Sequence, residues 1–495
     1  MRPLSPIVRS LSDIENFLGI ESCNAQVNIS GITSDSRNVQ AGDLFLALQG
    51  VGQNSQHGGT FAQQAIANGA VAILSDGKFD SADLKVPVVT MPNLPMFVGD
   101  LTSWFYSHPS RSMLTVGITG TNGKTTTASL LSQLWKLADR ESGCIGTLGV
   151  DIGNEHFAGT HTTPEATHIQ SILACMAERH ITHAVMEVSS HALAQHRVSG
   201  TRFSLVGFSN LSQDHLDFHQ TMEQYFAAKA KLFTVEFADR GFINIDDAHG
   251  LKLSEISEIP VATLSRFNSS ATWHYVRAEL ARSGFDISIR GAGGILIEGF
   301  LPLVGAHNLD NALMAIAMAV ESGVDPLLIA ARLHEIRGIP GRLEKIELGQ
   351  AFTAVVDFAH SPDSVSQVLA TLRASTPGKL IAVLGCGGDR DKTKRPLMGS
   401  ALIDGSDIAI FTSDNPRSEN PEEILKDMTR SLSLPQSSLI ELDRRTAIAR
   451  AVELAEPGDC VAILGKGHES GQEINGVKNP FDDRLELAEA IGGHK

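Results

Sequence analysis

A glycine-rich segment that ends in Lys-Thr is the strongest chemical signal in the chain. Residues 119–127 read Thr-Gly-Thr-Asn-Gly-Lys-Thr-Thr-Thr. The backbone N–H groups of such a turn bind phosphate oxygens, Lys124 can neutralise the β- and γ-phosphates, and the Thr125 hydroxyl can ligate Mg²⁺. Ile118 stands where the generic phosphate loop has glycine, so agreement with that pattern begins at Gly120. The segment predicts ATP binding; the alternative is a simple tight turn.

Two further segments carry groups that suit a metal ion. Glu187 interrupts an apolar run at 184–188, which would place its carboxylate at the sheet edge that holds the phosphate loop. Mg²⁺ prefers such oxygen ligands, although a strand-end ion pair is the alternative. In the segment 214–219, His215 and His219 lie four residues apart, as in zinc-binding helices, but no third zinc ligand is evident. A structural role for His215 is an equal alternative.

Lys229 shares the apolar face of a predicted helix. The residues that recur with it at helical spacing are Met222, Tyr225, Phe226, Leu232 and Phe233, whereas Lys231 lies off this stripe. A buried, unpaired ammonium group is unfavourable. Lys229 can avoid that cost by snorkelling to the surface. It can also react as a neutral amine with CO₂ to give a carbamate, which bridges metal ions as a carboxylate does.

Polar groups also follow apolar runs in the last third of the chain. Asp357 starts the segment Asp-Phe-Ala-His-Ser-Pro, and Arg342 lies upstream of it. Arg342 can stabilise charge on a γ-phosphate from across a cleft, or can be an ordinary surface residue. Arg417 follows another strand and offers a fork suited to a carboxylate, and Glu469 ends the segment 465–469. Arg417 and Glu469 together suit a zwitterion.

Alternating strands and helices are needed to position these groups. Strands are expected at 43–48, 70–74, 113–118, 183–188, 204–208, 353–357, 380–384, 408–411 and 460–464, and a helix is expected after the phosphate loop. This alternation is typical of parallel sheets covered by helices. We predict an α/β protein of three domains, 1–108, 109–338 and 339–495. The second is a P-loop parallel-sheet ATPase domain, and the third is a Rossmann-like domain.

Composition excludes several function classes. The chain has 495 residues, 42% hydrophobic and 19% charged, and a formal net charge of −16 that opposes binding to nucleic acid or to an anionic membrane. Five scattered cysteines without a Cys-x-x-Cys pair suit reduced thiols in the cytoplasm. No apolar run approaches the roughly 18 residues that span a bilayer. The loop 385–388 resembles a dinucleotide fingerprint, but Arg390 stands where the third glycine belongs, which disfavours NAD.

Together these segments resemble the Mur ligases, the ATP-dependent amino-acid-adding enzymes of peptidoglycan synthesis. The resemblance runs from Thr33 to Glu473. The motifs that carry it are Thr33-Ser-Asp-Ser-Arg37, Gly120-Thr-Asn-Gly-Lys-Thr125, His161-Thr-Thr-Pro-Glu165, Met186-Glu-Val-Ser-Ser-His191, Gln195-His-Arg197, Asp214-His-Leu-Asp217, Ala228-Lys229, Asp414-Asn-Pro-Arg417 and Gly465-Lys-Gly-His-Glu469.

The resemblance implies which residues act. It implies an ATP site at Gly120, Thr121, Asn122, Gly123, Lys124, Thr125, Thr126, Asp357 and His360. Mg²⁺ would be held by Thr125, Glu187, His215 and carbamylated Lys229, and the catalytic residues would be Lys124, Lys229, His215 and Arg342. The UDP-sugar dipeptide would contact Ser34, Ser36, Thr162, Thr163, Ser189, Gln195 and Arg197, and the added amino acid would contact Arg390, Asp414, Asn415, Pro416, Arg417, Gly465 and Glu469.

The implied reaction joins meso-2,6-diaminopimelate to UDP-N-acetylmuramoyl-L-alanyl-D-glutamate through an acyl phosphate. Family members with Asp-Asn-Pro-Arg add diaminopimelate, whose second carboxylate can pair with Arg417; lysine lacks that carboxylate. Phe358 and Ser361 depart from the family pattern, which has Tyr and Thr there. Three domains sharing one reaction imply hinges near 109–112 and 338–342, and we expect a cytoplasmic monomer. The rival interpretations are a folylpolyglutamate synthetase and a nucleotide-sensing regulator without ligase activity.

Overall fold

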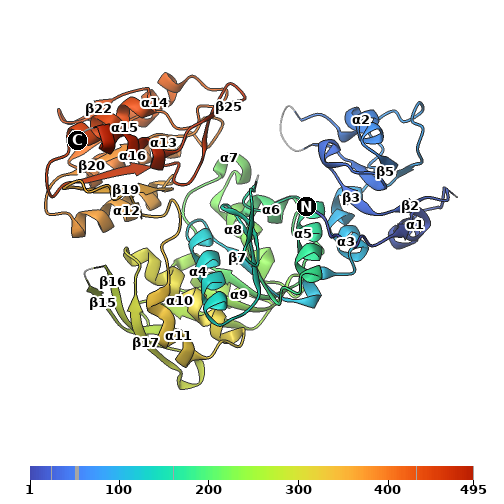
Figure 1. The fold of residues 1–495 in the computed structure, drawn as a ribbon, viewed down its shortest axis with the longest axis horizontal. Helices are drawn as coiled ribbons and strands as arrows, with labels where there is room; N and C mark the ends of the chain where they lie inside the picture. Colours follow the sequence, from blue (N-terminus) through green and yellow to red (C-terminus); the bar gives the residue numbers. More distant parts are fainter. Residues whose placement is uncertain (24, 51–54, 160, 282, 431, 494–495) are drawn as a thin grey trace.

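Three sheets succeed one another along the chain. The computed structural model describes residues 1–495 except 24, 51–54, 160, 282, 431 and 494–495. In Figure 1 the N-terminal sheet lies at one end, the largest sheet in the middle and the C-terminal sheet at the other end. The predicted three-domain α/β fold is confirmed, and the limits 1–108, 109–338 and 339–495 remain our proposal for the domain boundaries.

The N-terminal sheet is small and parallel. Its strands, in spatial order, are β3 (Gly31–Thr33), β4 (Asp43–Ala47), β5 (Ala70–Ser75) and β6 (Val88–Thr90). β4 is buried along its whole length, as its apolar sequence predicts. A separate pair joins β1 (Arg9–Ser10) to β2 (Asn28–Ile29). The predicted strands at 43–48 and 70–74 are therefore confirmed.

The central sheet is parallel in its middle and antiparallel at both ends. Its strands, in spatial order, are β10 (Glu155–Phe157), β9 (Gly149–Ile152), β8 (Ser142–Gly146), β11 (His183–Glu187), β7 (Leu114–Thr119), β12 (Phe203–Phe208), β13 (Ala238–Asn244), β14 (Val261–Ser265), β15 (Trp273–Ala281), β16 (Gly284–Arg290) and β17 (Leu296–Leu301). The strands from β8 to β15 pair in parallel. The antiparallel additions differ from the expected purely parallel sheet. β15, β16 and β17 follow one another through short turns, and such connections produce antiparallel pairs.

The C-terminal sheet is again mostly parallel. Its strands, in spatial order, are β18 (Glu344–Lys345), β19 (Thr353–Asp357), β23 (Cys460–Leu464), β20 (Leu380–Leu384), β21 (Ile408–Phe411) and β22 (Leu439–Ile440). All pairs are parallel except that of β18 with β19. The four strands predicted for this domain are confirmed. The hairpin of β24 (Gly471–Ile474) and β25 (Val477–Pro480) lies outside the sheet.

Helices flank all three sheets. In the first domain they are α1 (Leu11–Leu18), α2 (Ala62–Ala67) and α3 (Leu94–Phe105). The central helices are α4 (Lys124–Leu137), α5 (Ala166–Glu178), α6 (Ser190–Ala194), α7 (Leu216–His219), α8 (Met222–Ala230), α9 (Ala248–Ile256), α10 (Ala306–Glu321) and α11 (Pro326–Arg332). The C-terminal helices are α12 (Pro362–Ser375), α13 (Lys394–Gly405), α14 (Pro421–Thr429), α15 (Arg444–Glu453) and α16 (Asp483–Gly493).

Short 3₁₀ turns complete the connections. They are η1 (Ser36–Asn38), η2 (Gly58–Phe61), η3 (Pro109–Ser112), η4 (Lys231–Phe233), η5 (Ala292–Gly294) and η6 (Leu333–Glu335). η3 falls at the first predicted hinge.

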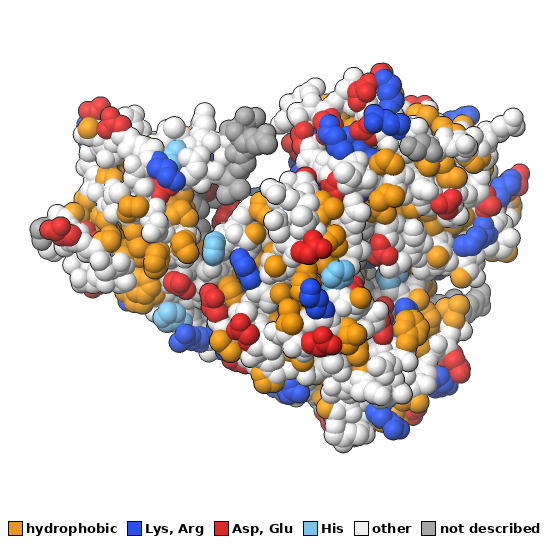
Figure 2. Space-filling model, turned by 180° about the vertical axis from the view of Figure 1, so that it is seen from behind, with side chains coloured by type: hydrophobic (Ala, Val, Ile, Leu, Met, Phe, Trp, Pro, Cys, Tyr) orange, Lys and Arg blue, Asp and Glu red, His pale blue; other side chains and the backbone are white. Residues whose placement is uncertain are grey.

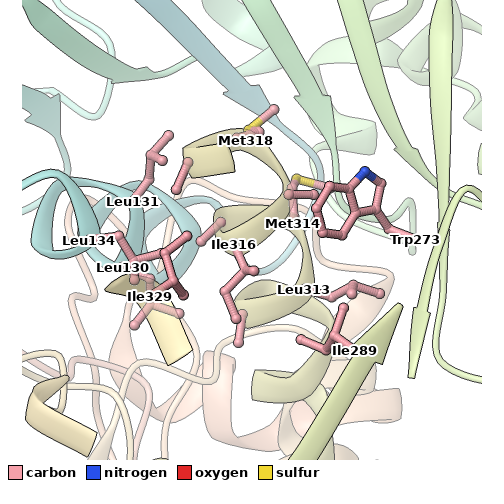
Figure 3. Packing of buried hydrophobic residues seen from close by; sticks show 14 of the residues in the cluster. Leu130, Leu131, Leu134, Trp273, Ile289, Leu313, Met314, Ile316, Met318 and Ile329 are labelled. Carbon is pink, nitrogen blue, oxygen red and sulfur yellow. The ribbon is translucent and has the colours of Figure 1, made fainter. Parts of the chain in front are cut away.

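The core of the central domain holds the phosphate-loop helix in place. Figure 3 shows α4 contributing Leu130 and Leu134 toward Ile316 of α10 and Ile329 of α11, while Trp273 from β15 packs farther along α10. Most of α10 is buried because nearly all of its side chains after Asn311 are apolar. Each fully buried Leu, Ile or Met side chain stabilises the fold by about 1.5–3 kcal/mol relative to an exposed one. The loop that precedes α4 is thus anchored to a rigid support.

The surface carries both signs of charge. Figure 2 shows Lys and Arg side chains interspersed with Asp and Glu over the face that it displays. Among the described residues, no helix is both long and apolar enough to cross a membrane.

Candidate active site

The phosphate loop joins β7 to α4. Ile118 is a fully buried residue of β7, so the loop begins only after the strand has ended, which explains the departure from the generic pattern. Gly120 and Gly123 have φ angles of 151° and 88°. A Cβ on Gly120 would lie 1.9 Å from Ser209 Oγ, and one on Gly123 would lie 2.2 Å from an Asn311 oxygen. Glycine is therefore required at both positions.

Lys124 lies over the phosphate loop, where its charge could neutralise a bound phosphate. Its Nζ donates to the carbonyls of Gly120 and Thr121, both at 2.9 Å. Burial lowers the pKa of Lys124, and the carboxylates of Glu187 and Asp214 oppose that shift. The ammonium group thus sits beside the backbone N–H groups at the start of α4, where phosphate is favoured.

Glu187 lies at the end of β11 beside Thr125, as its place in the sequence predicts. Its carboxylate accepts from Thr125 Oγ1 at 2.9 Å, Thr147 N at 2.8 Å and Thr147 Oγ1 at 3.1 Å. Arg342 Nη2 donates to the same Thr125 hydroxyl at 3.1 Å. Arg342 is thus half-buried and directed toward the phosphate loop, and its guanidinium lies 4.5 Å from the centre of the Phe358 ring. Its Nε is buried and has no hydrogen-bond partner among the residues that the structure describes, which suits an anionic ligand.

Lys229 is buried on α8, and its side chain does not snorkel. Its exposed fraction is 1%, while Lys231 on the next turn is exposed. The Nζ donates to Gly120 O at 2.7 Å and lies 4.7 Å from the centre of the Tyr225 ring. Burial, with repulsion from Lys124, holds the pKa of Lys229 well below its usual range. The neutral amine, the form that reacts with CO₂, is therefore more accessible at this position than for an exposed lysine.

The two histidines of the segment 214–219 have different partners. His215 Nε2 lies 3.5 Å from Asp214, whereas His219 Nε2 is 2.9 Å from Ser190 Oγ. Burial lowers the pKa of His215 well below its usual range. Within the described residues, no three His, Cys, Asp or Glu side chains come together as a metal-binding group.

Four residues expected to contact the muramoyl dipeptide meet beside Glu187. Thr163 Oγ1 donates to Glu187 O at 2.8 Å and accepts from Ser189 N at 3.0 Å. Arg197 Nη1 donates to Thr163 O at 3.1 Å, and the hydroxyl oxygens of Thr162 and Thr147 lie 3.0 Å apart. Within the described part of the chain, the buried atoms Gln195 Oε1 and Arg197 Nε have no hydrogen-bond partner.

Ser34 and Ser36 lie apart from that group, in the N-terminal domain. The Ser34 hydroxyl is 3.5 Å from Thr167 on α5, so this serine faces the central domain. The Ser36 hydroxyl donates to Gln64 at 3.2 Å.

The C-terminal domain presents its polar groups at the carboxyl ends of β19, β21 and β23. Asp357 accepts from the N–H groups of Leu343 and Ala359 at 2.7 Å each, and burial raises its pKa. Asn415 Nδ2 donates to Glu469 Oε2 at 2.9 Å. The buried Lys466 donates to both Asn415 and Glu469, at 3.0 and 2.8 Å. Lys466 thus orients two residues expected to contact the amino acid.

Arg417 has an unusual backbone and a partly open side chain. Its φ is 51°, a conformation that non-glycine residues seldom adopt. Its Nη1 donates to Gly388 O at 2.6 Å, and its Nε lies 3.5 Å from Glu473. Burial lowers the pKa of Arg390, and the nearby Arg417 charge lowers it further. The neighbouring guanidinium groups of Arg390 and Arg417 therefore suit an anionic ligand.

A cleft of about 650 Å³ brings the central and C-terminal groups together. The sequence-predicted residues that line it are Thr121, Asn122, Gly123, Lys124, Thr125, Thr126, Thr162, Glu187, Ser189, His215, Arg342, Asp357, His360, Arg390, Asp414, Asn415, Arg417, Gly465 and Glu469. Gly120, Thr163, Gln195, Arg197, Lys229 and Pro416 do not line this cleft, and neither do Ser34 and Ser36.

Sequence reasoning missed several residues of the cleft. His307, Asn308, Asp310 and Asn311 line it from the first two turns of α10, and Arg266 and Phe267 line it from the loop after β14. Burial raises the pKa of Asp310 to about 7. The sequence feature that could have pointed to the α10 residues is the cluster of polar side chains at the start of an otherwise apolar helix. Arg444 was also missed: it pairs with Asp483 at 2.7 Å and donates to Ser413 O and Leu464 O, which secures two site loops.

Phe358 and Ser361, which depart from the family pattern, can still fill the physical roles of the Tyr and Thr that they replace. Phe358 retains an aromatic face for Arg342. Ser361 is the N-cap of α12: its Oγ accepts from Ser364 N at 3.3 Å, and Ser364 Oγ accepts from Ser361 N at 3.0 Å. Serine and threonine both supply such a hydroxyl.

Ser361→Ala should therefore lower the free energy of unfolding by about 1 kcal/mol, because an N–H at the start of α12 loses its partner. Ser361→Thr should change it by less than about 0.5 kcal/mol. Urea unfolding of the two variants and the wild type measures both values. Equal stabilities for the alanine variant and the wild type would show that the cap contributes nothing.

A phosphate loop at the carboxyl end of an interior strand of a mainly parallel sheet, facing a second α/β domain across a cleft, defines a multidomain phosphate-loop protein with a Rossmann-like partner domain. Three family models cover most of the chain: the Mur ligase family catalytic domain at residues 28–106, the Mur ligase middle domain at 118–319 and the Mur ligase glutamate ligase domain at 341–467. The chain belongs to the Mur ligase family.

Individual relatives align over nearly the full chain. A Streptomyces coelicolor protein named UDP-N-acetylmuramoyl-L-alanyl-D-glutamate--2,6-diaminopimelate ligase is 43% identical, with 99% of this chain and 98% of the relative covered. An Aquifex aeolicus protein of the same name is 41% identical, with 94% of each covered. A solved structure with that name is 34% identical, with a TM-score of 0.66 and 98% and 99% covered. MurF from Acinetobacter baumannii, at 16% identity and a TM-score of 0.69, with 99% of each chain covered, shares the fold.

Proposed function

We propose that this protein is the ATP-dependent ligase that adds meso-2,6-diaminopimelate to UDP-N-acetylmuramoyl-L-alanyl-D-glutamate in peptidoglycan precursor synthesis. One observation carries the proposal: a single cleft holds the phosphate loop with Lys124 on the central-domain side and Arg417 with Glu469 on the C-terminal side. Relatives named for this reaction align along the whole chain.

The first chemical step joins two anions. The glutamyl carboxylate oxygen attacks the γ-phosphorus of ATP, the new O–P bond forms, the bond to the β-phosphate oxygen breaks, and ADP leaves. Two unit charges 4 Å apart repel by about 4 kcal/mol at an effective dielectric of 20. Lys124 and Arg342 offset this repulsion because both cations adjoin Thr125, at the head of the phosphate loop.

The second step forms the amide bond. The neutral amine of diaminopimelate attacks the acyl carbon and a tetrahedral intermediate forms. The C–O bond to phosphate then breaks, phosphate leaves with the bonding electrons, and the proton lost by the nitrogen goes to the departing phosphate. Arg417 and Arg390 bind carboxylate, and Glu469 binds the ammonium group that is not reacting. Catalysis here is chiefly positioning, since the amine must approach an acyl phosphate held on the opposite wall.

Mg²⁺ suits the donors beside the phosphate loop. Thr125, Glu187 and His215 offer hydroxyl, carboxylate and imidazole groups, and a carbamate on Lys229 would add two further oxygens. A bound Mg²⁺ supplies positive charge that neutralises the phosphates. The fit rests on the contact between Glu187 and Thr125 and on the lowered pKa of Lys229.

Release of phosphate tests the function. ATP and UDP-N-acetylmuramoyl-L-alanyl-D-glutamate are supplied with meso-diaminopimelate in one reaction and with L-lysine in another. We expect sustained release only with diaminopimelate and only when all three substrates are present. Release with lysine would contradict the specificity assigned to Arg417. No release with either amino acid would favour the folylpolyglutamate or regulator interpretation, which a folate substrate and an ATP-binding assay then separate.

The remaining expectations stay predictions. Light scattering checks the monomeric state, and fractionation of cells checks the cytoplasmic location. Hinges near 109–112 and 338–342 also stay predictions. Gly341 within the second segment has a positive φ, and so does His108, the residue just before the first segment.

A further inference from the structure

The interface between the central and C-terminal domains contains a buried ion pair. Lys394 Nζ, on the C-terminal side, lies 2.8 Å from Asp214 Oδ1 on the central side. The exposed fractions of the two side chains are 9% and 5%. Both residues line the cleft, but neither is among the residues to which we assign contact with ATP, metal or dipeptide. The pair therefore needs another explanation.

Local structure explains why Lys394 requires a carboxylate. It is the first residue of α13, where the positive end of the helix dipole disfavours a cation. The next residue, Arg395, meets the same problem and pairs within its own domain, with Glu419 at 2.8 Å and Asp427 at 3.0 Å. In the described part of the chain, the ion pair found for Lys394 is the one with Asp214. Its compensating charge thus comes from the opposite domain.

Asp214, the central-domain member of the ion pair, adjoins the predicted metal site. Asp214 directly precedes His215 and accepts from its backbone N–H at 2.9 Å, while His215 Nε2 is 3.5 Å and His360 Nε2 is 3.7 Å from Oδ2. A second cross-domain bond flanks the pair, from Gln213 Nε2 to Thr393 Oγ1 at 3.1 Å. Asp391 holds that threonine by accepting from its N–H and hydroxyl groups.

We propose that Lys394 is a positioning residue whose ion pair with Asp214 holds the C-terminal domain against the central domain in the reactive arrangement. When the domains dock, the same contact brings the Arg417 wall of the cleft toward the phosphate loop and braces the backbone at His215. The inference rests on the proposed function for its catalytic consequence, but its conformational consequence is independent of the reaction.

Small-angle X-ray scattering of the ligand-free full chain tests the conformational part. Lys394→Met removes the charge and keeps a similar chain length. We expect its radius of gyration to exceed that of the wild type, because the domains separate about the 338–342 hinge. Lys392→Met is the matched control, since Lys392 is a nearby lysine that pairs with Glu419 of its own domain at 2.9 Å; its profile should match the wild type. A Lys394→Met profile identical to the wild type would overturn the proposal.

Steady-state kinetics test the catalytic part. Lys394→Met should lower kcat about tenfold, equivalent to about 1.4 kcal/mol, with the KM for ATP changed less than twofold. Lys394→Arg, which keeps the charge, should recover most of the kcat. Asp214→Asn combined with Lys394→Met should lose no more than the worse single variant, because the two residues act through one contact. Independent, multiplying losses would overturn the pairing.

The outcomes separate this inference from the proposed function. If the wild type releases no phosphate with diaminopimelate, the function fails, while the scattering comparison still decides the ion pair. If Lys394→Met does not fold by circular dichroism, the comparison of Lys394→Arg with Asp214→Asn replaces it: wild-type scattering for Asp214→Asn would then overturn the proposal.

Discussion

Arg417→Ala is expected to lower kcat/KM for meso-diaminopimelate by about 30-fold to 5,000-fold, with ATP affinity unchanged within about twofold. The loss corresponds to about 2–5 kcal/mol, the usual cost of removing one partner of a desolvated, hydrogen-bonded charge pair. Phosphate-release kinetics with varied diaminopimelate and calorimetric titration with ATP measure the two quantities. Equal loss of both would indicate misfolding instead.

The structure gives this residue a prepared geometry. Arg417 is held in the left-handed conformation by backbone bonds at both sides, from its own N–H to Glu473 O at 3.0 Å and from Asn475 N to its carbonyl at 2.7 Å. Residues held in such sparsely populated conformations cluster at ligand sites. The side chain leaves this framework toward the cleft, with Gly388 O and Glu473 as its partners. A ligand carboxylate would compete with Glu473, which is the weaker contact at 3.5 Å.

Arg417→Lys provides the matched control. Lysine keeps the positive charge but loses the two-pronged geometry, so the variant should fall between the wild type and the alanine variant. L-lysine as the competing substrate completes the comparison, since it lacks the second carboxylate. If Arg417→Ala discriminated between diaminopimelate and lysine as well as the wild type does, specificity would have to come from another residue.

Lys229→Ala is expected to lower phosphate release by about 100-fold to 1,000-fold, the usual effect of removing one group that stabilises developing charge. The carbamate that we propose on this side chain would supply a negative charge and two oxygens to Mg²⁺, and alanine removes both. Added short carboxylic acids should restore part of the activity of the alanine variant, because they can occupy the space and replace the carboxylate.

Lys231→Ala is the control for that experiment. Lys231 follows α8 by one residue but is exposed, so its loss should leave activity and stability nearly unchanged. ¹³C NMR of wild-type protein equilibrated with ¹³CO₂ observes the carbamate directly, and the signal should disappear in Lys229→Ala. Full activity of Lys229→Ala without any added acid would contradict the carbamate.

The local signals in the chain were sufficient for much of the site. The glycine spacing of the phosphate loop, the carboxylate at the end of β11 and the lysine on the apolar stripe of α8 each depend on short-range periodicity and backbone sterics. Family motifs added residues that no single pattern defines, such as Thr162 and Gln195. Where reasoning from the residues left two alternatives, burial decided: Lys229 ends against Gly120, and Arg342 reaches Thr125.

Other features were outside the reach of sequence patterns. The antiparallel extension by β16 and β17 depends on turn connections that a strand-by-strand prediction does not weigh. The polar first two turns of α10 line the cleft only because α10 packs against α4, the helix that carries the loop. Arg444 and Asp483 are far apart in the chain and form a fully buried ion pair. Neither sequence segment alone predicts this pair.

The sequence by itself determined the α/β class, the three-part organisation and the position of the glycine-rich loop between a strand and a helix, because these follow from local periodicity and from residues adjacent in the chain. Only the tertiary structure decided that Lys394 pairs with Asp214, that Lys466 orients Asn415 and Glu469, and that two domains line one cleft. The contact between Lys394 and Asp214 joins distant positions, and it is favoured because a buried charge needs a partner of opposite sign, which no local pattern records.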